Sequence, residues 1–299
     1  MLVATHDGSF HADEVFAIAT LGLAGEALEV VRTRERDAVA QADLRVDVGF
    51  CDDPTTGDFD HHQRGFDRAR DNGVRYASFG LVWREFGARA CGGDQDVADA
   101  VDETLVQSVD ANDAGQQLTR PLVDGVRPMT VNSIIGGFNT RWDEELTPEQ
   151  ERERFDAAVA LARDILAREV ASAASGRRSQ RLVHAAVNAA RDPRVIELPV
   201  NLPWKQALVP VTSDALFVIY PKRQGFGLEA VPRELGSFEN RSDLPAAWGG
   251  LEGDDLVRAT GVEDALFCHA KRFLAVARTR AAITQLAELA LAELALAES

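Results

Sequence analysis

The first sixty residues alternate between short apolar runs and polar stretches that have helical spacing. Three apolar runs, at Leu2–Thr5, Leu28–Val31 and Leu44–Val48, have the length and composition of buried strands. Between them, Asp13–Leu23 carries apolar residues at helical spacing, and the polar stretch Arg34–Ala42 predicts a short helix. Strands that alternate with helices predict right-handed crossovers, and therefore an α/β fold with a mainly parallel sheet and flanking helices.

The middle of the chain is mostly helical in pattern. Phe59 either ends a fourth strand or lies in the loop after it, and both interpretations stay open. A long amphipathic helix is predicted from Pro148 to about Ala174, with Thr147 as its N-cap and Gly176 as its break. The other segments are the predicted helices Ser78–Ala90, Asp96–Val109 and Arg177–Ala190 and the short apolar segment Val131–Phe138.

After Pro193 the pattern changes to short strands separated by proline and glycine. We therefore expect a domain boundary between residues 165 and 195, with the long helix as connector. The first domain would cover residues 1–175, a smaller C-terminal α/β domain would cover residues 190–299, and the active site would lie in the cleft between them. The predicted elements are the strands Val195–Val200, Ala215–Tyr220, Leu228–Val231 and Ala265–His269 and a final helix from about Thr279 to the end.

Charge and cysteine content exclude some functional classes for this chain and favour others. The 299 residues contain 48 acids and 32 bases, for a formal net charge of −16. This balance argues against a protein that coats nucleic acid, but a metal-dependent nuclease carries its positive charge locally. Three scattered cysteines without zinc-type spacing favour a reduced, cytoplasmic setting. We see no secretory leader and no membrane-spanning run, and therefore expect no membrane partner. A homo-oligomer stays open.

Histidines and acids follow the predicted strands. His6 lies one residue past the first strand, Asp47 ends the third, and Asp60, His61 and His62 follow the candidate fourth. The carboxyl ends of parallel strands meet at one edge of a sheet, so these side chains should converge. Imidazole and carboxylate groups together are typical ligands of divalent transition metals.

Two more acidic positions extend this set. Asp13 begins the first helix after the loop from His6, and Asp110 and Asp113 close a later helix. Each pair of carboxylates about 4 Å apart costs on the order of 4 kcal/mol at an effective dielectric near 20, unless a cation intervenes. A pair of metals would remove that cost and would activate water for hydrolysis, with Asp47 best placed to bridge them. Single residues of these types are more often caps, turns or surface pairs.

The motifs together resemble the Myg exonuclease family, a branch of the Asp-His-His phosphoesterase superfamily that also holds RecJ nucleases and family II pyrophosphatases. The resemblance covers essentially the whole chain. Its motifs are Thr5-His6-x-Gly8-x-Phe10-His11-x-Asp13-Glu14, Val31–Arg34, Val46–Gly49, Phe59-Asp60-His61-His62-Gln63-Arg64, Val109-Asp110-Ala111-x-Asp113, Leu216–Tyr220, Ala230–Pro232 and Phe267–Ala270.

The resemblance implies a metal-dependent phosphodiesterase, a 3′-to-5′ exonuclease on RNA that uses a water activated by two metal ions. Mn²⁺ is the expected ion, with Mg²⁺, Co²⁺ or Zn²⁺ as alternatives. His62 would contact the scissile phosphate, and Asp60 would orient a ligand histidine. By the same resemblance one metal is held by His6, His11 and Asp47, and the other by Asp13, Asp47, His61 and either Asp110 or Asp113.

The chain departs from the superfamily at its expected substrate loop. In place of the usual Gly-Gly-His it has Ala275–Arg280, in which Arg278 and Arg280 suit phosphate recognition but also fit an exposed helix turn. Arg64, beside the metal motif, is a further candidate for substrate binding. Two alternatives stay open: a phosphohydrolase of small nucleotides or pyrophosphate, and a metal-stabilised binding protein without turnover.

Overall fold

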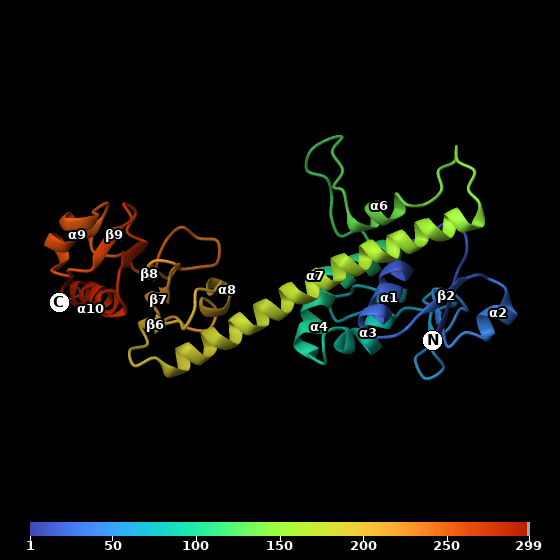
Figure 1. Cartoon of the computed structure of the whole chain (residues 1–299), viewed down its shortest axis with the longest axis horizontal. Coiled ribbons are helices and arrows are strands. Elements are labelled where there is room, and N and C mark those ends of the chain that lie inside the picture. The colour runs from blue at the N-terminus through green and yellow to red at the C-terminus, as the bar shows by residue number, and fades with distance from the viewer. Residues whose placement is uncertain (298–299) are drawn as a thin grey trace. The chain divides into compact units, whose positions relative to one another are not determined.

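The computed structural model describes residues 1–297 and divides the chain into two compact units, Met1–Ala174 and Ser175–Ser299. Figure 1 follows the chain from the blue N-terminal strand to the red C-terminal helix α10. Each unit contains one five-stranded sheet with its own helices, so the α/β class is confirmed. Within residues 1–297, no helix combines the length and apolar character needed to cross a bilayer.

The sheet of the first unit has the strand order β2-β1-β3-β5-β4. Parallel pairing joins β1 to β2, β1 to β3 and β3 to β5, but β4 runs antiparallel to β5. Only four residues connect β4 to β5, and so short a connection forces antiparallel pairing. The strands are β1 (Leu2–Thr5), β2 (Glu29–Arg32), β3 (Leu44–Val46), β4 (Asp52–Asp53) and β5 (Asp58–Phe59).

Helix α1 is the centre of the first unit's core. Its residues from Ala12 to Leu21 are all buried, and Phe16 contacts Phe79 of α3 with ring centroids 5.3 Å apart. The helix predicted at 96–109 is three consecutive segments, the middle one a π-helical turn. The helices are α1 (Ala12–Leu23), α2 (Arg36–Ala40), α3 (Ser78–Ala90), α4 (Gln95–Val101), η1 (Asp102–Val106, π), α5 (Gln107–Asp113) and α6 (Val131–Gly136).

Helix α7 (Pro148–Ala189) is continuous, so the predicted break at Gly176 is wrong. A glycine inside a helix costs about 1 kcal/mol relative to alanine, but it keeps its backbone N–H and does not interrupt the hydrogen bonds. The predicted N-cap is confirmed. Thr147 and Gln150 form a reciprocal pair, in which each side-chain oxygen accepts the other residue's backbone N–H.

The sheet of the second unit has the order β6-β7-β8-β10-β9, and only β6 and β7 are parallel. Both sheets are therefore mixed, and the expected mainly parallel arrangement is not confirmed. Strand β10 was not predicted. The strands are β6 (Val195–Glu197), β7 (Phe217–Pro221), β8 (Phe226–Ala230), β9 (Ala265–Cys268) and β10 (Leu274–Ala277).

Short helices and one long helix complete the second unit. Ile283 and Leu286 of α10 are fully buried and pack into the same core as Phe217 and Leu228 of the sheet. The helix expected from Thr279 to the end begins at Arg280, and its last two expected residues lie outside the described residues. The helices are α8 (Lys205–Leu208), η2 (Ala246–Trp248, 3₁₀), α9 (Gly253–Thr260) and α10 (Arg280–Ala297).

Candidate metal centre

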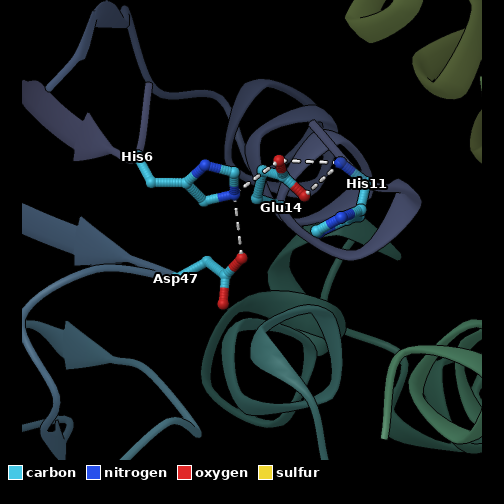
Figure 2. Close-up of side chains that lie close together, drawn as sticks. All are labelled: His6, His11, Glu14 and Asp47. Atoms are coloured by element: carbon cyan, nitrogen blue, oxygen red, sulfur yellow. Dashed lines mark hydrogen bonds and ion pairs between the residues drawn. The ribbon is translucent and has the colours of Figure 1, made fainter. Parts of the chain in front are cut away.

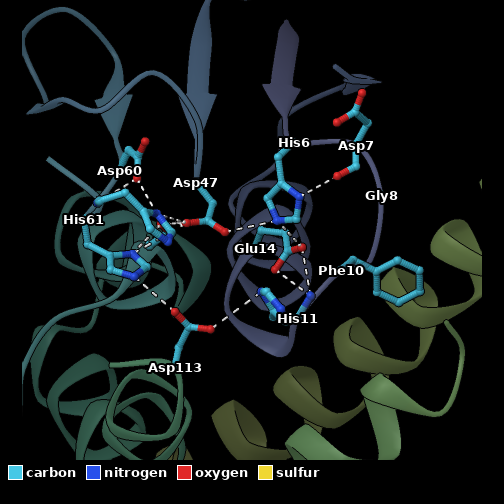
Figure 3. Close-up of polar contacts among 12 residues, drawn as sticks. His6, Asp7, Gly8, Phe10, His11, Glu14, Asp47, Asp60, His61 and Asp113 are labelled. Carbon is cyan, nitrogen blue, oxygen red and sulfur yellow. Dashed lines mark hydrogen bonds and ion pairs between the residues drawn. The ribbon is translucent and has the colours of Figure 1, made fainter. Parts of the chain in front are cut away.

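Three neighbouring strands of the first unit end at the candidate site. His6 follows β1, Asp47 follows β3, and Asp60 with His61 and His62 follows β5. Because β1, β3 and β5 are adjacent and parallel, their carboxyl ends lie side by side. Figure 3 shows the side chains converging from these strand ends and from helices.

Asp47 lies at the centre of this group. Its backbone adopts a left-handed conformation, with φ of 56°, which asparagine and aspartate tolerate better than most residues. One carboxylate oxygen lies 3.3 Å from Nε2 of His6, and the other lies 3.1 Å from Nδ1 of His62 and 3.6 Å from Nδ1 of His61. Ser78 at the start of α3 donates its hydroxyl to Asp47 over 3.0 Å. Three imidazoles therefore surround one buried carboxylate.

Glu14 belongs to the same group, although the sequence analysis assigns it no role. Its Oε1 lies 3.0 Å from Nε2 of His6, and its two oxygens accept the backbone N–H of His11 over 2.9 and 3.0 Å (Figure 2). Its position three residues after His11 fits a helix capping box, a pattern that needs no functional site to explain it. The side chain is fully buried. Glu14 orients the loop between His6 and His11.

Asp13 and Asp113 form the other side of the cluster. Asp113 lies at the end of α5, 3.1 Å from Nε2 of His61 and 3.8 Å from Nδ1 of His11. Asp13 is fully buried, and among residues 1–297 neither of its oxygens has a hydrogen-bond partner. A buried carboxylate without a donor is costly, and a cation is the usual remedy.

The described part of the chain contains three groups of candidate ligands. Within each group, one ligand atom from every residue lies within 4.8 Å of those of the other members. Asp47 belongs to two of the groups and His11 belongs to two, so the groups adjoin. They are His6, His11, Glu14 and Asp47; Asp47, Asp60, His61 and His62; and His11, Asp13 and Asp113.

Asp110 lies outside these three groups. One of its oxygens accepts the backbone N–H of Gly80 over 2.9 Å, and the other accepts Nη1 of Arg70 over 2.9 Å. A Cβ at position 80 would overlap this carboxylate, so glycine is required there. Arg70 also pairs with Asp102 in the π-helical turn. Asp110 thus links α5 to the first turn of α3, which carries Ser78.

Comparison with known proteins places the chain in a family. The family model described as "Uncharacterised protein family (UPF0160)", the MYG1 exonuclease model, matches residues 2–291. The chain belongs to the MYG1 exonuclease family. The human MYG1 exonuclease is 31% identical to it over 93% of this chain and 82% of its own length.

Two further relatives show how widely the MYG1 family extends. The MYG1 exonuclease of Bos taurus is 31% identical over 93% of this chain and 81% of its own length, and a MYG1 protein of Saccharomyces cerevisiae is 29% identical over 96% and 94%. No solved structure matches this chain significantly. The placement of this chain in the Asp-His-His superfamily stays a prediction.

The electrostatics of this MYG1-family site are those of an anionic cluster that attracts cations. Burial alone would lower the pKa of His6, but its hydrogen bonds to Asp47 and Glu14 raise it to about 10. Hydrogen bonds to Asp47 and Asp60 likewise raise the pKa of His62 to about 10. Burial, followed by the charge of Asp47, raises the pKa of Asp13 well above its usual value. The donor set, the burial and the unpartnered Asp13 together fit divalent metal ions.

Asp60 connects the site to the loop that follows β3. Its Oδ1 accepts the backbone N–H of His62 over 2.9 Å and lies equally far from Nδ1 of the same ring. Its Oδ2 accepts the backbone N–H of Phe50 over 2.6 Å. The side chain is almost completely buried. Asp60 therefore fixes the His62 ring and the loop after β3 together.

The predicted arginines lie at three places. Arg64 is exposed, two residues after His62. In the second unit, Nε of Arg278 lies 3.7 Å from Oδ1 of Asp264, and Arg280 forms a two-pronged ion pair with Glu197. Arg278 follows β10 and Arg280 begins α10, so the segment 275–280 is a strand end and a helix start.

Proposed function

We propose that the chain is a metal-dependent phosphodiesterase with two metal positions that share Asp47. His6, His11 and Asp47 would hold one ion. Asp13, Asp47, His61 and Asp113 would hold the other, with Asp113 preferred over Asp110 because Asp110 is already bonded to Arg70 and Gly80. The observation that carries the proposal is the buried Asp13 carboxylate, which has no hydrogen-bond partner among residues 1–297 and faces this donor set.

The protein groups around the metals have distinct roles in this proposal. Bound divalent ions would lower the pKa of a water molecule and polarise phosphate oxygens. His62 is half exposed and held by Asp60, so it is suited to contact the scissile phosphate and to stabilise its developing charge. Ser78 and Glu14 act on the ligands: Ser78 fixes Asp47, and Glu14 fixes the His6 ring and the backbone of His11.

We infer from the names of the relatives that the substrate is a nucleic acid strand cleaved from one end, and propose a 3′-to-5′ exoribonuclease with Mn²⁺ as its ion. The candidates for backbone contact are Arg64, Arg278 and Arg280. A second candidate function, hydrolysis of a small phosphate ester, is favoured by the net charge of −16, which disfavours long polyanions. The ratio of kcat/KM on a long RNA to that on a dinucleotide decides between them.

The test of the proposal is Asp47→Asn, with Asp58→Asn on the neighbouring strand as matched control. Asp58 pairs with Arg45, outside the three ligand groups. The Asp47 variant should bind Mn²⁺ far more weakly by calorimetry and lose phosphodiester hydrolysis by about 10³-fold or more, roughly 4 kcal/mol of barrier. Full turnover in that variant would overturn the two-metal site. Mn²⁺ binding by the wild type without hydrolysis of any phosphate ester would instead support a binding protein.

A further inference from the structure

The candidate metal centre opens into a cavity whose lining extends beyond the candidate ligands. The cavity measures about 1160 Å³ and is lined on one side by His6, His11, Asp47 and His62. Small-molecule sites usually measure roughly 300–1000 Å³, so a single phosphate or pyrophosphate would fill only part of this one. The rest of its lining includes Arg34, Arg36, Val39, Ala40, Val48 and Phe50.

Phe50 is the unusual residue of that wall. Its side chain is 68% exposed, and its backbone is left-handed, with φ of 57°. A bulky residue in that conformation costs free energy, and such strain is typical of functional sites. A scattered exposed phenylalanine needs no explanation by itself. An exposed aromatic ring on a strained loop that lines the same cavity as the metal cluster does need one.

The loop that carries Phe50 is tied to the reaction site. The backbone N–H of Phe50 donates to Asp60, and the same carboxylate fixes the ring of His62. Asp47 lies only three residues earlier in the chain, directly after β3. The position of Phe50 relative to the cluster is therefore set by buried groups, although the ring itself is open to a ligand.

Positive charge on the cavity wall comes from α2 and the turn before it. Arg34 and Arg36 both line the cavity and are exposed, and Nε of Arg34 lies 3.2 Å from Oδ1 of Asp7. Arg45 also lines the cavity, but its guanidinium pairs with Asp58 and donates to backbone carbonyl groups. Arg34 and Arg36 are thus the guanidinium groups suited to a second phosphate.

We propose that Phe50 stacks against a nucleobase of the substrate, with Arg34 and Arg36 contacting a phosphate beyond the one at the metals. This inference rests on the proposed function, because it assumes that a phosphate ester binds at the cluster. Aromatic rings stack on any base, so the exposed ring of Phe50, the stacking platform, would recognise nucleotides as a class without reading their sequence. The substrate is then a nucleotide chain or dinucleotide, and a base-free phosphate ester would lose the contact.

The test compares a base-bearing ligand with a base-free ligand on the full chain with Mn²⁺. The first is 2-aminopurine riboside 5′-monophosphate, whose fluorescence is quenched when the base stacks, and the second is ribose 5-phosphate. Phe50→Ala should abolish the quenching and raise Kd for the nucleotide by about 5- to 100-fold, with little change for ribose 5-phosphate. Phe50→Trp should keep the quenching. Arg36→Ala should leave both monophosphates unchanged, because their single phosphate lies at the metals, and should weaken 2-aminopurine riboside 3′,5′-bisphosphate and reduce the salt dependence of its binding.

Phe238 supplies the matched control, because its ring is fully exposed in the second unit. Phe238→Ala should leave both ligands unchanged. Equal weakening of both ligands in Phe50→Ala, wild-type quenching in that variant, or no quenching in the wild type would each overturn the platform. If Phe50→Ala does not fold, Phe50→Gly removes the ring and suits the left-handed backbone. If the wild type hydrolyses no phosphate ester but still shows quenching that depends on Phe50, the proposed function is overturned and the stacking role of Phe50 stands.

Discussion

The two units differ in the groups that they bury. Among the described residues, the carboxylate and imidazole side chains classed as buried all belong to the first unit, whereas the ionisable groups buried in the second unit are the phenol of Tyr220 and the thiol of Cys268. Charges are costly to bury unless they are paired or bound to metal. The core of the second unit therefore contains no buried carboxylate or imidazole among the described residues, whereas the first unit carries an electrostatic cost at its strand ends. Those buried groups are His6, Asp13, Glu14, Asp47, Asp60 and Asp110.

The largest expected effect is that Mn²⁺ stabilises only the first unit. At a free concentration of about a thousand times Kd, a ligand that binds only the folded state adds about 4 kcal/mol to the free energy of unfolding. Hydrogen exchange followed segment by segment should show slower exchange in α1 and β3 on adding Mn²⁺, and unchanged exchange in β7 and β8. Equal protection of both sheets would contradict the contrast between the units.

Asp110 and Asp113 allow a sharper test, because both are acids of α5 but only one faces the ligand groups. Asp110→Ala should destabilise the first unit by about 3 kcal/mol, at the low end for a broken buried ion pair, since Arg70 keeps Asp102 as a partner. Asp113→Ala should cost little stability in metal-free protein but should weaken Mn²⁺ binding. Urea unfolding and calorimetry on both variants measure the two effects. Weaker Mn²⁺ binding in Asp110→Ala alone would reverse their proposed roles.

The sequence predicted which residues would meet but not which contacts each would make. His6, Asp47 and His61 lie together because the order of strands dictates it, and their role as ligands stays a prediction. The choice between Asp110 and Asp113 could not be made, since it depends on Arg70, which is 40 residues away from Asp110 in the chain. Such long-range pairing leaves no local pattern.

Two parts of the fold cannot be predicted from the sequence pattern, for different physical reasons. Strand β10 has the sequence Leu-Ala-Val-Ala, and alanine is a poor indicator of strands because its small side chain says little about packing. Ala275 and Ala277 are nonetheless fully buried. Gly176 predicts a helix end by residue type alone, but a glycine ends a helix only where the hydrogen bonds also stop, and in α7 they continue.

The metal-free site should lose stability as pH rises, whereas the second unit should not. A histidine whose pKa is raised on folding stabilises the folded state fully below its unfolded value near 6.5, and the contribution is lost as pH rises through the folded value. For His6 and His62 that value is about 10. Stability of the first unit should fall between pH 7 and 10 by up to about 1.4 kcal/mol per pH unit for His6, and by less for the half-exposed His62.

Mn²⁺ should cancel this pH dependence, because ligand histidines bind metal as neutral imidazoles and release their protons. Apparent Mn²⁺ affinity should therefore rise with pH over the same range, and titration in weak buffer should detect the released protons. Hydrogen exchange at pH 7 and pH 9, with and without Mn²⁺, separates the units. A metal-free first unit that is equally stable at both pH values would contradict the raised pKa values.

The smallest expected effect concerns α7, the helix that contains the boundary between the two units. Gly176 lies inside α7, one residue past the start of the second unit, and a Cβ built there meets no atom within 4 Å. Gly176→Ala should therefore stabilise the chain by about 0.5–1 kcal/mol, because alanine loses less backbone entropy in a helix than glycine does. Ser175→Ala, a neighbouring change within the same helix, is the control and should have a smaller effect. If Gly176→Ala destabilised the chain, the backbone at residue 176 would not be helical in solution, and the two units would be joined by a hinge rather than by one continuous helix.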